Sequence, residues 1–299
     1  MLQIPIIVIG RNGQLARELA DLAWPADIRP CFLGRGEVNF LAPADLARQL
    51  GALAPVAAIN TAAYTAVDAA QTEPFLAQQL NAEAPALIAA AARELEIPLV
   101  HISTDYVFAG SAGRPYREDD ATAPLSVYGQ TKLAGERAVL ASGACAVTVR
   151  SASLFGRHGQ NFLKAILTKA ALQGAQINMV ADQVCSPTPA ADLSRLVQRI
   201  ALDLVAGRRL PPCLHIAGGP AVSWFEFTRA ILDARWEMGM TTYPTLTPMS
   251  LSNLSRPAPR PLNSALDCSL AASLGYTAPD WRAALPGLIT TLAGRKEAA

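Results

Sequence analysis

The chain is poor in several residue types, and each shortage argues against a class of protein. Its 299 residues include only four lysines and three histidines, and charged residues make up 16% of the chain against 51% hydrophobic residues. So large an apolar fraction argues against disorder. The net charge is +1 with no basic run, which argues against nucleic acid or an anionic membrane as the main partner.

Cysteine is also scarce and follows no pattern. There are five cysteines, an odd number, and no CxxC spacing, which argues against a disulfide framework. No secretory signal precedes the first apolar run, "MLQIPIIVIG", so we expect a reduced, cytoplasmic setting. The alanine-rich run "LIAAAA" ends at Arg93 and Glu94, well short of the ~20 apolar residues that a membrane span needs. We therefore expect a soluble globular protein without a membrane partner.

Short apolar runs alternate with segments of helical periodicity in the first half of the chain. The predicted strands are residues 4–10, 28–34, 55–60, 98–104 and 145–150, and the predicted helices are 13–23, 43–53, 74–96 and one that bears Tyr128 and Lys132. Strands that are apolar throughout, separated by helices, indicate a parallel sheet covered on both faces. We expect an α/β protein with a Rossmann-type, doubly wound parallel sheet.

A glycine-rich turn follows the first predicted strand. The stretch "IGRNGQLA" places Gly10, Gly13 and Ala16 at G-x-x-G-x-x-A spacing. Gly10 permits the tight turn, Gly13 lets the backbone approach a pyrophosphate, and the small Ala16 lets helix and strand pack closely. An ordinary turn has the same glycines, but the position after the first strand of an α/β alternation favours dinucleotide binding.

The end of the second predicted strand bears on the choice of cofactor. An acidic residue there favours NAD, whereas a nearby arginine accommodates the 2′-phosphate of NADP. The stretch "LGRGE" offers Arg35, with Glu37 as the competing residue. We predict NADPH and leave NADH open.

The pattern changes near residue 151 and suggests a second lobe. We expect residues 1–150 to form the NAD(P)-binding domain, completed by parts of 189–212 and 280–299. Residues 151–279 are expected to form mainly a smaller C-terminal substrate-binding lobe. Within it, residues 242–263 are rich in proline, which suits an irregular segment over a ligand better than a sheet core.

Tyr128 and Lys132 lie four positions apart at the start of a predicted helix, so both can lie on one face. When a hydride reduces a carbonyl, the developing alkoxide needs a proton, and a free tyrosine with a pKa of about 10 is a poor donor. A nearby ammonium lowers that pKa. Thr104, at the end of the predicted strand in "HISTDYVF", offers a hydroxyl to the carbonyl oxygen, although such residues also cap turns.

Together these features resemble the extended short-chain dehydrogenase/reductase superfamily. Further motifs resemble the dTDP-4-dehydrorhamnose reductase family, in order and along nearly the whole chain. They are "GRNGQLA", "NTAAYTAVDAAQ", "LNAEAP", "STDYVFAG", "PLSVYGQTKLAGE" and "RPLNSALD". The resemblance implies NADPH-dependent reduction of the 4-keto group of dTDP-4-dehydro-β-L-rhamnose to dTDP-β-L-rhamnose.

The resemblance also assigns roles to residues. Tyr128 would be the proton donor, Lys132 the partner that lowers its pKa, and Thr104 the hydroxyl that polarises the carbonyl. The cofactor would contact Gly10, Asn12, Gly13, Gln14, Leu15, Arg35, Asn39, Phe40, Ala62, Ala63, Tyr64 and Thr65, together with Tyr128 and Lys132. The nucleotide-sugar substrate would contact Val67, Asp105, Tyr106, Ser153 and Arg260, the last as a diphosphate clamp.

Two departures from the family pattern keep other functions open. Ser153 in "SASLF" stands where the family commonly has an aromatic residue, and Cys185 in "ADQVCSPT" stands where it has glycine. One alternative is therefore a 4-ketoreductase for another nucleotide-activated deoxysugar. A second is a catalytically silent, NADP-binding regulatory relative, against which the joint presence of Thr104, Tyr128 and Lys132 argues.

The sequence gives no clear metal site. Some family members bind Mg²⁺ through carboxylates, but we assign no metal ligands in this chain. Glu18 is expected to be a solvated helix residue, His158 an isolated histidine and His101 a core histidine within an apolar strand. Trp224 is expected to serve in packing. A homodimer stays open.

Overall fold

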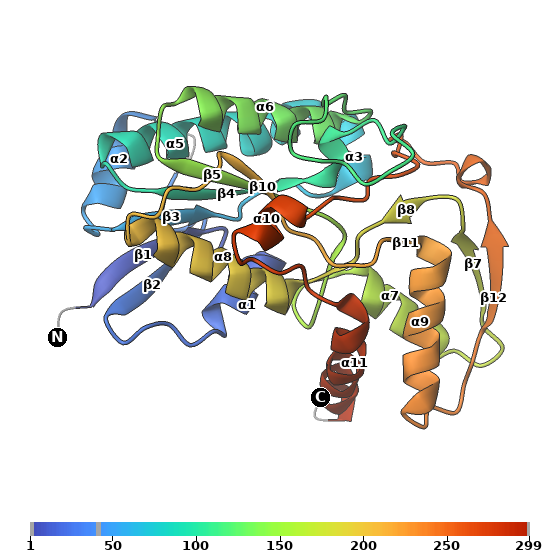
Figure 1. The fold of residues 1–299 in the computed structure, drawn as a ribbon. Helices are drawn as coiled ribbons and strands as arrows, with labels where there is room; N and C mark the ends of the chain where they lie inside the picture. Colours follow the sequence, from blue (N-terminus) through green and yellow to red (C-terminus); the bar gives the residue numbers. More distant parts are fainter. Residues whose placement is uncertain (1–2, 40–42, 298–299) are drawn as a thin grey trace.

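The computed structural model describes residues 3–39 and 43–297, and a six-stranded parallel sheet forms the centre of its larger lobe (Figure 1). The strands lie in the order β10-β5-β4-β3-β1-β2, and all neighbouring pairs are parallel. Their bounds are β1 Ile4–Ile9, β2 Ile28–Leu33, β3 Ala57–Asn60, β4 Leu99–Thr104, β5 Ala146–Ser151 and β10 Cys213–His215. This architecture confirms the predicted Rossmann-type sheet.

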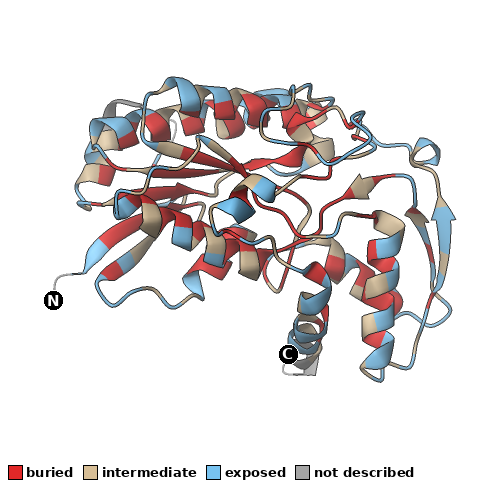
Figure 2. Cartoon of the chain, viewed as in Figure 1, coloured by how far each residue is buried: buried red, intermediate tan, exposed pale blue. Residues whose placement is uncertain are grey.

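Helices cover both faces of this sheet (Figure 1). On one face lie α2 (Pro43–Gly51), α3 (Val67–Thr72), α5 (Ala84–Glu94) and α6 (Val127–Ala141), with α4 (Pro74–Gln78) and a π-helical segment (Gln79–Glu83) leading into α5. On the other face lie α1 (Gln14–Ala20) and α8 (Ala190–Val205). The sheet is accordingly buried between two helical layers (Figure 2).

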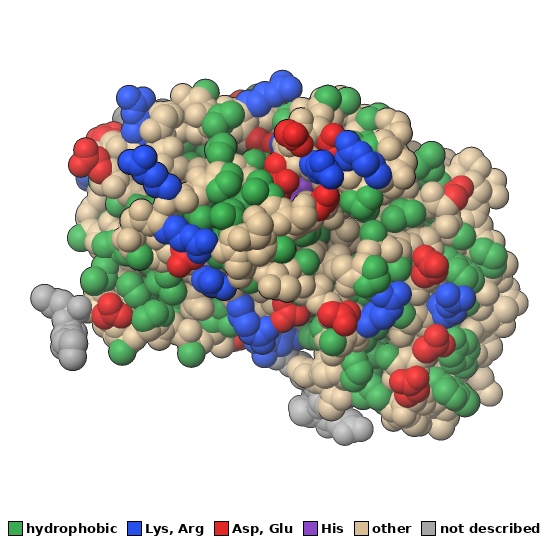
Figure 3. Space-filling view, in the orientation of Figure 1, with side chains coloured by type: hydrophobic (Ala, Val, Ile, Leu, Met, Phe, Trp, Pro, Cys, Tyr) green, Lys and Arg blue, Asp and Glu red, His purple; other side chains and the backbone are tan. Residues whose placement is uncertain are grey.

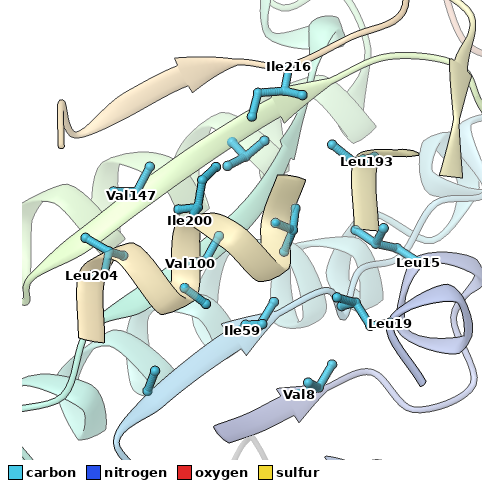
Figure 4. Close-up of a cluster of buried hydrophobic side chains, with 14 of the residues drawn as sticks. Val8, Leu15, Leu19, Ile59, Val100, Val147, Leu193, Ile200, Leu204 and Ile216 are labelled. Atoms are coloured by element: carbon cyan, nitrogen blue, oxygen red, sulfur yellow. The ribbon is translucent and has the colours of Figure 1, made fainter. Parts of the chain in front are cut away.

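The apolar side chains of the strands explain this layering. Val8, Ile59, Val100 and Val147 point from four strands toward Ile200 of α8, and all five are buried (Figure 4). A parallel sheet needs such cover on both faces because its strands carry apolar side chains in both directions. The larger lobe therefore has one core on each side of the sheet.

The direction of chain travel reverses between β1 and β3. From β1 the chain passes to β2 on one side, and from β3 it passes to β4 and β5 on the other. The loops after these strands separate at this point and leave a crevice at the carboxyl edge of the sheet, where ligands bind in such folds.

The smaller lobe is built from helices and short sheets. Its helices are α7 (Phe162–Ala170), α9 (Trp224–Glu237) and α11 (Trp281–Glu297), which surround a core that includes Phe155, Phe227 and Trp281. Its strand pairs are β7 (Gln176–Val180) with β12 (Thr245–Met249), β8 (Val184–Cys185) with β11 (Val222–Ser223), and β6 (Leu154–Phe155) with β9 (Thr188–Pro189). The remaining elements are α10 (Ser269–Ser273) and 3₁₀ turns at Asp105–Val107 and Leu251–Asn253.

The packing corrects the expected division of the chain in two places. Leu193 and Val197 of α8 lie in the core of the larger lobe, as expected for 189–212. By contrast, Trp281 and Leu285 of α11 lie in the core of the smaller lobe with α9, so the expected contribution of 280–299 to the larger domain is wrong. The proline-rich segment 242–263 also contains a strand, β12, which pairs with β7. We infer that the smaller lobe comprises most of 152–189 and 220–262, together with α11.

The distribution of surface charge and the length of the apolar helices bear on which partners the protein can bind. On the face drawn in Figure 3, cationic and anionic side chains alternate without a large area of one charge. Among the described residues, no helix is long and apolar enough to cross a membrane.

Candidate active site

A cavity of about 880 Å³ opens at the carboxyl edge of the sheet. It runs from the glycine turn after β1 to Trp224 at the start of α9, so both lobes contribute to its wall. Sixteen of the residues expected from the sequence line it: Gly10, Asn12, Gly13, Gln14, Leu15, Arg35, Ala62, Ala63, Thr65, Val67, Thr104, Asp105, Tyr106, Tyr128, Lys132 and Ser153. Residues more than a hundred positions apart in sequence thus share one cavity.

Three expected site residues that the structure describes lie elsewhere. The hydroxyl of Tyr64 turns away to the carboxylate of Glu73, at 2.5 Å. Arg260 lines a second cavity of about 470 Å³. Asn39 is exposed beyond the end of β2, and Phe40 lies outside the described residues.

The glycine turn packs closely against the loop that follows β3. Gly10 has φ +102°, and a Cβ at this position would lie 2.8 Å from the backbone nitrogen of Ala62. Helix α1 begins after Gly13 without a side-chain cap, so its first N–H groups are available to phosphate oxygens. The turn therefore fits the diphosphate of a bound dinucleotide.

Tyr128 and Thr104 meet in the cavity. Tyr128 stands in the first turn of α6, which Ser126 caps by accepting a hydrogen bond from the N–H of Gly129 at 3.2 Å. The Tyr128 hydroxyl hydrogen-bonds the side chain of Thr104. Thr104 in turn donates to Oδ1 of Asp105 at 3.0 Å and accepts from the N–H of Tyr106 at 3.2 Å. Thr104 thus joins the tyrosine to a buried carboxyl group.

The expected effect of Lys132 on Tyr128 is not what the structure shows. Burial and the nearby Asp105 raise the pKa of Tyr128 to about 12, although the hydrogen bond between Tyr128 and Thr104 acts to lower it. Lys132 is turned toward the backbone, where its Nζ donates to the carbonyl of Ile102 at 2.6 Å. Burial lowers the pKa of Lys132 to about 8. Tyr128 is therefore protonated at neutral pH, as a proton donor must be before transfer.

Asp105 is a buried carboxyl group with unusual protonation. Burial raises its pKa to about 6, against the lowering effect of hydrogen bonds from Ser264 and Thr104. Its Oδ2 makes no hydrogen bond among the described residues, and the same holds for the hydroxyls of Ser103 and Ser151, which also line the cavity. Buried polar atoms are normally paired, so these groups fit a polar ligand in the cavity.

An arginine that the sequence analysis missed lies against the end of β2. Arg11 donates to the carbonyl of Phe32 at 2.9 Å and pairs with Glu37. Arg11, Arg35 and Glu37 all line the cavity. Glu37 also accepts from the N–H of Gly34 at 2.8 Å. The position of Arg11 directly after Gly10 was the available signal, because that turn faces the end of β2 in such folds.

Comparison with known proteins bears on this geometry. Residues 4–293 match the family model described as "RmlD substrate binding domain". The chain belongs to the dTDP-4-dehydrorhamnose reductase family. A dTDP-4-dehydrorhamnose reductase of Sinorhizobium fredii is 35% identical over 96% of this chain and 97% of its own. A probable dTDP-4,6-dihydroxy-2-methyloxan-3-one 4-ketoreductase of Streptomyces antibioticus is 37% identical over 93% and 92%.

A solved family structure has the same fold. The dTDP-4-dehydrorhamnose reductase of Bacillus anthracis in complex with NADP is 28% identical, with a TM-score of 0.88 over 97% of this chain and 100% of that one. The agreement extends through both lobes, including the smaller one.

A charged cluster that the sequence analysis did not predict lies at the end of α1. Glu18, Asp21 and His158 have ligand atoms within 4.8 Å of one another. Glu18 is 1% exposed, so the expectation of a solvated residue is wrong, and His158 is not isolated. Arg157 donates to Glu18 at 3.1 Å and pairs with Asp21 at 2.9 Å. Its guanidinium supplies positive charge to these carboxylates.

His101 behaves as expected. It is fully buried in β4, and its Nδ1 lies 3.1 Å from Nδ2 of Asn60 on the neighbouring strand. Burial lowers the pKa of His101 well below its usual value, so it is neutral and serves in the core.

Proposed function

We propose that this protein catalyses the NADPH-dependent reduction of the 4-keto group of dTDP-4-dehydro-β-L-rhamnose to dTDP-β-L-rhamnose. The observation that carries the proposal is the hydrogen-bonded series Tyr128–Thr104–Asp105 in a cavity that also contains the glycine turn. Named reductases of 35% identity and a solved relative in complex with NADP support the reaction and the cofactor.

The residues present fit a nicotinamide dinucleotide. The glycine turn of Gly10 and Gly13 would hold the diphosphate, and Arg11 and Arg35 would receive a 2′-phosphate at the end of β2. Lys132 and the unpaired hydroxyls of Ser103 and Ser151 would lie toward the nicotinamide half. When bound, this cofactor supplies the hydride.

Tyr128 would supply the proton. As the carbonyl carbon gains a hydride, its oxygen becomes an alkoxide that needs a proton, and Tyr128 holds one at neutral pH. In the free enzyme the Tyr128 hydroxyl is hydrogen-bonded to Thr104. The oxygen of the substrate carbonyl would bind between these two hydroxyls. When Asp105 is ionised, it accepts a hydrogen bond from Thr104. When it is protonated, it can donate one to Thr104, so Asp105 sets the direction of the Thr104 hydroxyl hydrogen.

Substitution of Tyr128 by phenylalanine tests this role. Tyr128→Phe should lower kcat by about 10²–10⁴-fold, the usual contribution of a general acid, with the Kd for NADPH unchanged. Oxidation of NADPH measured by absorbance with the dTDP-4-keto sugar gives the rate, and fluorescence titration gives the Kd. Tyr243→Phe, which alters an exposed tyrosine paired with Asp233, is the matched control and should keep full activity. Retained activity in Tyr128→Phe would refute the role of proton donor.

A second candidate is a 4-ketoreductase for another nucleotide-activated deoxysugar. Ser153 lines the cavity with φ +47°, an unusual conformation for a serine. It hydrogen-bonds the buried Cys185, so the two departures from the family pattern lie together. A named 4-ketoreductase of a different sugar at 37% identity also favours this candidate. A panel of dTDP-4-keto sugars decides: the sugar with the highest kcat/KM is the substrate. Tight NADPH binding without turnover of any sugar would instead indicate a silent relative.

A further inference from the structure

Arg260 lies on the wall of the second, smaller cavity. This cavity is lined mainly by the segment 250–262, including Ser250, Arg256 and Arg260. Asp182 also lines it, but the hydroxyl of Ser250 and the N–H of Leu251 already donate to that carboxylate. The Arg260 side chain is only 10% exposed. Arg260 is therefore a nearly buried cation beside a cavity.

One carboxylate of the larger lobe holds this arginine. Asp68 belongs to α3, next to Val67 of the main cavity. Its Oδ1 accepts from Nη1 of Arg260 at 3.0 Å, and its Oδ2 accepts from Nη2 at 2.9 Å. The same carboxylate accepts from the N–H of Ala258 at 3.3 Å and lies 3.7 Å from Nη1 of Arg256. Asp68 thus fixes both the guanidinium and the segment that carries it.

These contacts leave one edge of the Arg260 guanidinium unused. Nη1 spends its two hydrogens on Asp68 and on the carbonyl of Ala258, at 2.9 Å. Nη2 spends one hydrogen on Asp68. The second Nη2 hydrogen and the Nε–H make no hydrogen bond within the part of the chain that the structure describes. These two N–H groups are parallel, which is the geometry that binds two oxygens of one phosphate.

We propose that Asp68 is a positioning residue for substrate binding: it holds Arg260 by the Nη1–Nη2 end so that the free Nε–Nη2 edge binds the diphosphate of the nucleotide sugar. This inference rests on the proposed function. Val67 of the main cavity and Asp68, which holds Arg260, are consecutive residues of α3, so one ligand would place its sugar in the main cavity and its diphosphate at Arg260. Asp68 acts through Arg260 and contacts no substrate itself.

The test measures binding of dTDP and of thymidine to the full-length protein by calorimetry. Asp68→Asn should weaken dTDP binding about tenfold, because a displaced Arg260 guanidinium loses a charge-assisted hydrogen bond to the diphosphate. Thymidine, which has no phosphate, should bind unchanged. In the reductase assay the same variant should raise KM for the nucleotide sugar and leave kcat and the Kd for NADPH as they were. Asp120→Asn is the matched control, because Asp120 makes the same kind of bidentate pair with Arg114 and also accepts a backbone N–H.

A double-mutant comparison separates positioning from general damage. In the background of Arg260→Gln, Asp68→Asn should have little further effect on dTDP binding, because the guanidinium that Asp68 positions is absent. Tighter dTDP binding by Asp68→Asn would show that Asp68 competes with the ligand for Arg260, and this would overturn the proposal. Equal weakening of thymidine, an undiminished effect in the Arg260→Gln background, or a wild-type protein that binds no dTDP would overturn it as well. If dTDP binding depends on Asp68 but no dTDP-4-keto sugar is reduced, the proposed function fails and the positioning role stands.

Discussion

Asp105 combines a buried carboxyl group with a position in the cavity. Burial raises its pKa from 3.8 to about 6, so the folded protein binds the proton more tightly than the unfolded chain. For a raised acidic pKa, stability is lost as pH rises through the window between the two values. At pH 7 the charged form costs about 3 kcal/mol of stability, since each pKa unit corresponds to about 1.4 kcal/mol. Functional sites commonly contain groups that lower the stability of the fold, and Asp105 is such a group in this cavity.

We expect Asp105→Asn to be more stable than wild type at pH 7 and less active. The amide removes the ionisation while keeping an acceptor for Thr104, so the gain in the free energy of unfolding should approach 3 kcal/mol at pH 7. Denaturant unfolding at several pH values measures it, and the gain should shrink toward pH 4. For comparison, the pair with Arg114 lowers the pKa of Asp120, so Asp120→Asn should change stability in the opposite direction. A difference between Asp105→Asn and wild type that is constant with pH would rule out the ionisation of Asp105 as its cause.

Arg35 and Glu37 present opposite charges to the cavity at the end of β2. Arg35→Ala should weaken the binding of NADPH about tenfold and the binding of NADH much less. Only NADPH has a 2′-phosphate for the guanidinium to bind. Fluorescence titration with both cofactors gives the two Kd values. Equal weakening of both would show that Arg35 does not read the 2′-phosphate.

At the scale of elements, helix α6 depends on glycines where it touches its neighbours. A Cβ at Gly135 would lie 2.1 Å from the carbonyl oxygen of Asn81 in the π-helical segment. That segment is fixed by Asn81, which accepts from the N–H of Tyr64 and donates to the carbonyl of Tyr64 and the hydroxyl of Thr131. The contact therefore sets the distance between the helix that carries Tyr128 and the loop at Ala62–Thr65 that borders the cavity.

We expect Gly135→Ala to destabilise the protein by about 1–3 kcal/mol through overpacking. Helix propensity alone favours alanine over glycine by about 1 kcal/mol, but the clash with a backbone atom outweighs it. Gly287→Ala in α11 is the control, because nothing lies within 4 Å of its Cβ position; it should stabilise the protein by about 1 kcal/mol. Chemical denaturation compares the two, and a stabilised Gly135→Ala would show that α6 can shift away from the π-helical segment.

The elements themselves were largely predictable from the sequence, because each buried strand is apolar throughout and each helix has its own periodicity. Strands such as β1 and β4 and helices such as α2 lie within a few residues of their predicted bounds. The errors arose where packing overrides the local pattern. The strand β12 contains Pro248, which argues against a strand from sequence, yet it pairs along one edge of β7. The place of α11 could not be read locally, since its apolar side chains suit either core.

At the scale of the whole molecule, both lobes line the main cavity, so ligand binding should stabilise them together. NADPH at 100 times its Kd should add about 2.7 kcal/mol to the free energy of unfolding, by binding only the folded state. Gly10→Ala should remove this gain, because its Cβ would collide with Ala62 and its φ is positive. Thermal unfolding with and without NADPH measures it. Two transitions, of which only one moves with NADPH, would mean that the lobes unfold independently.

The sequence by itself determined the alternation of strands and helices, the glycine turn at Gly10 and the place of Thr104 at the carboxyl end of a strand. These follow from local rules: apolar runs, helical spacing, and the fact that parallel strands end at one edge. Only the tertiary structure decided the protonation of Asp105 and Tyr128, the turning of Lys132 to Ile102, the burial of Glu18 and the hold of Asp68 on Arg260. These depend on desolvation and on contacts between residues as far apart as 192 positions, which no local pattern in the chain encodes.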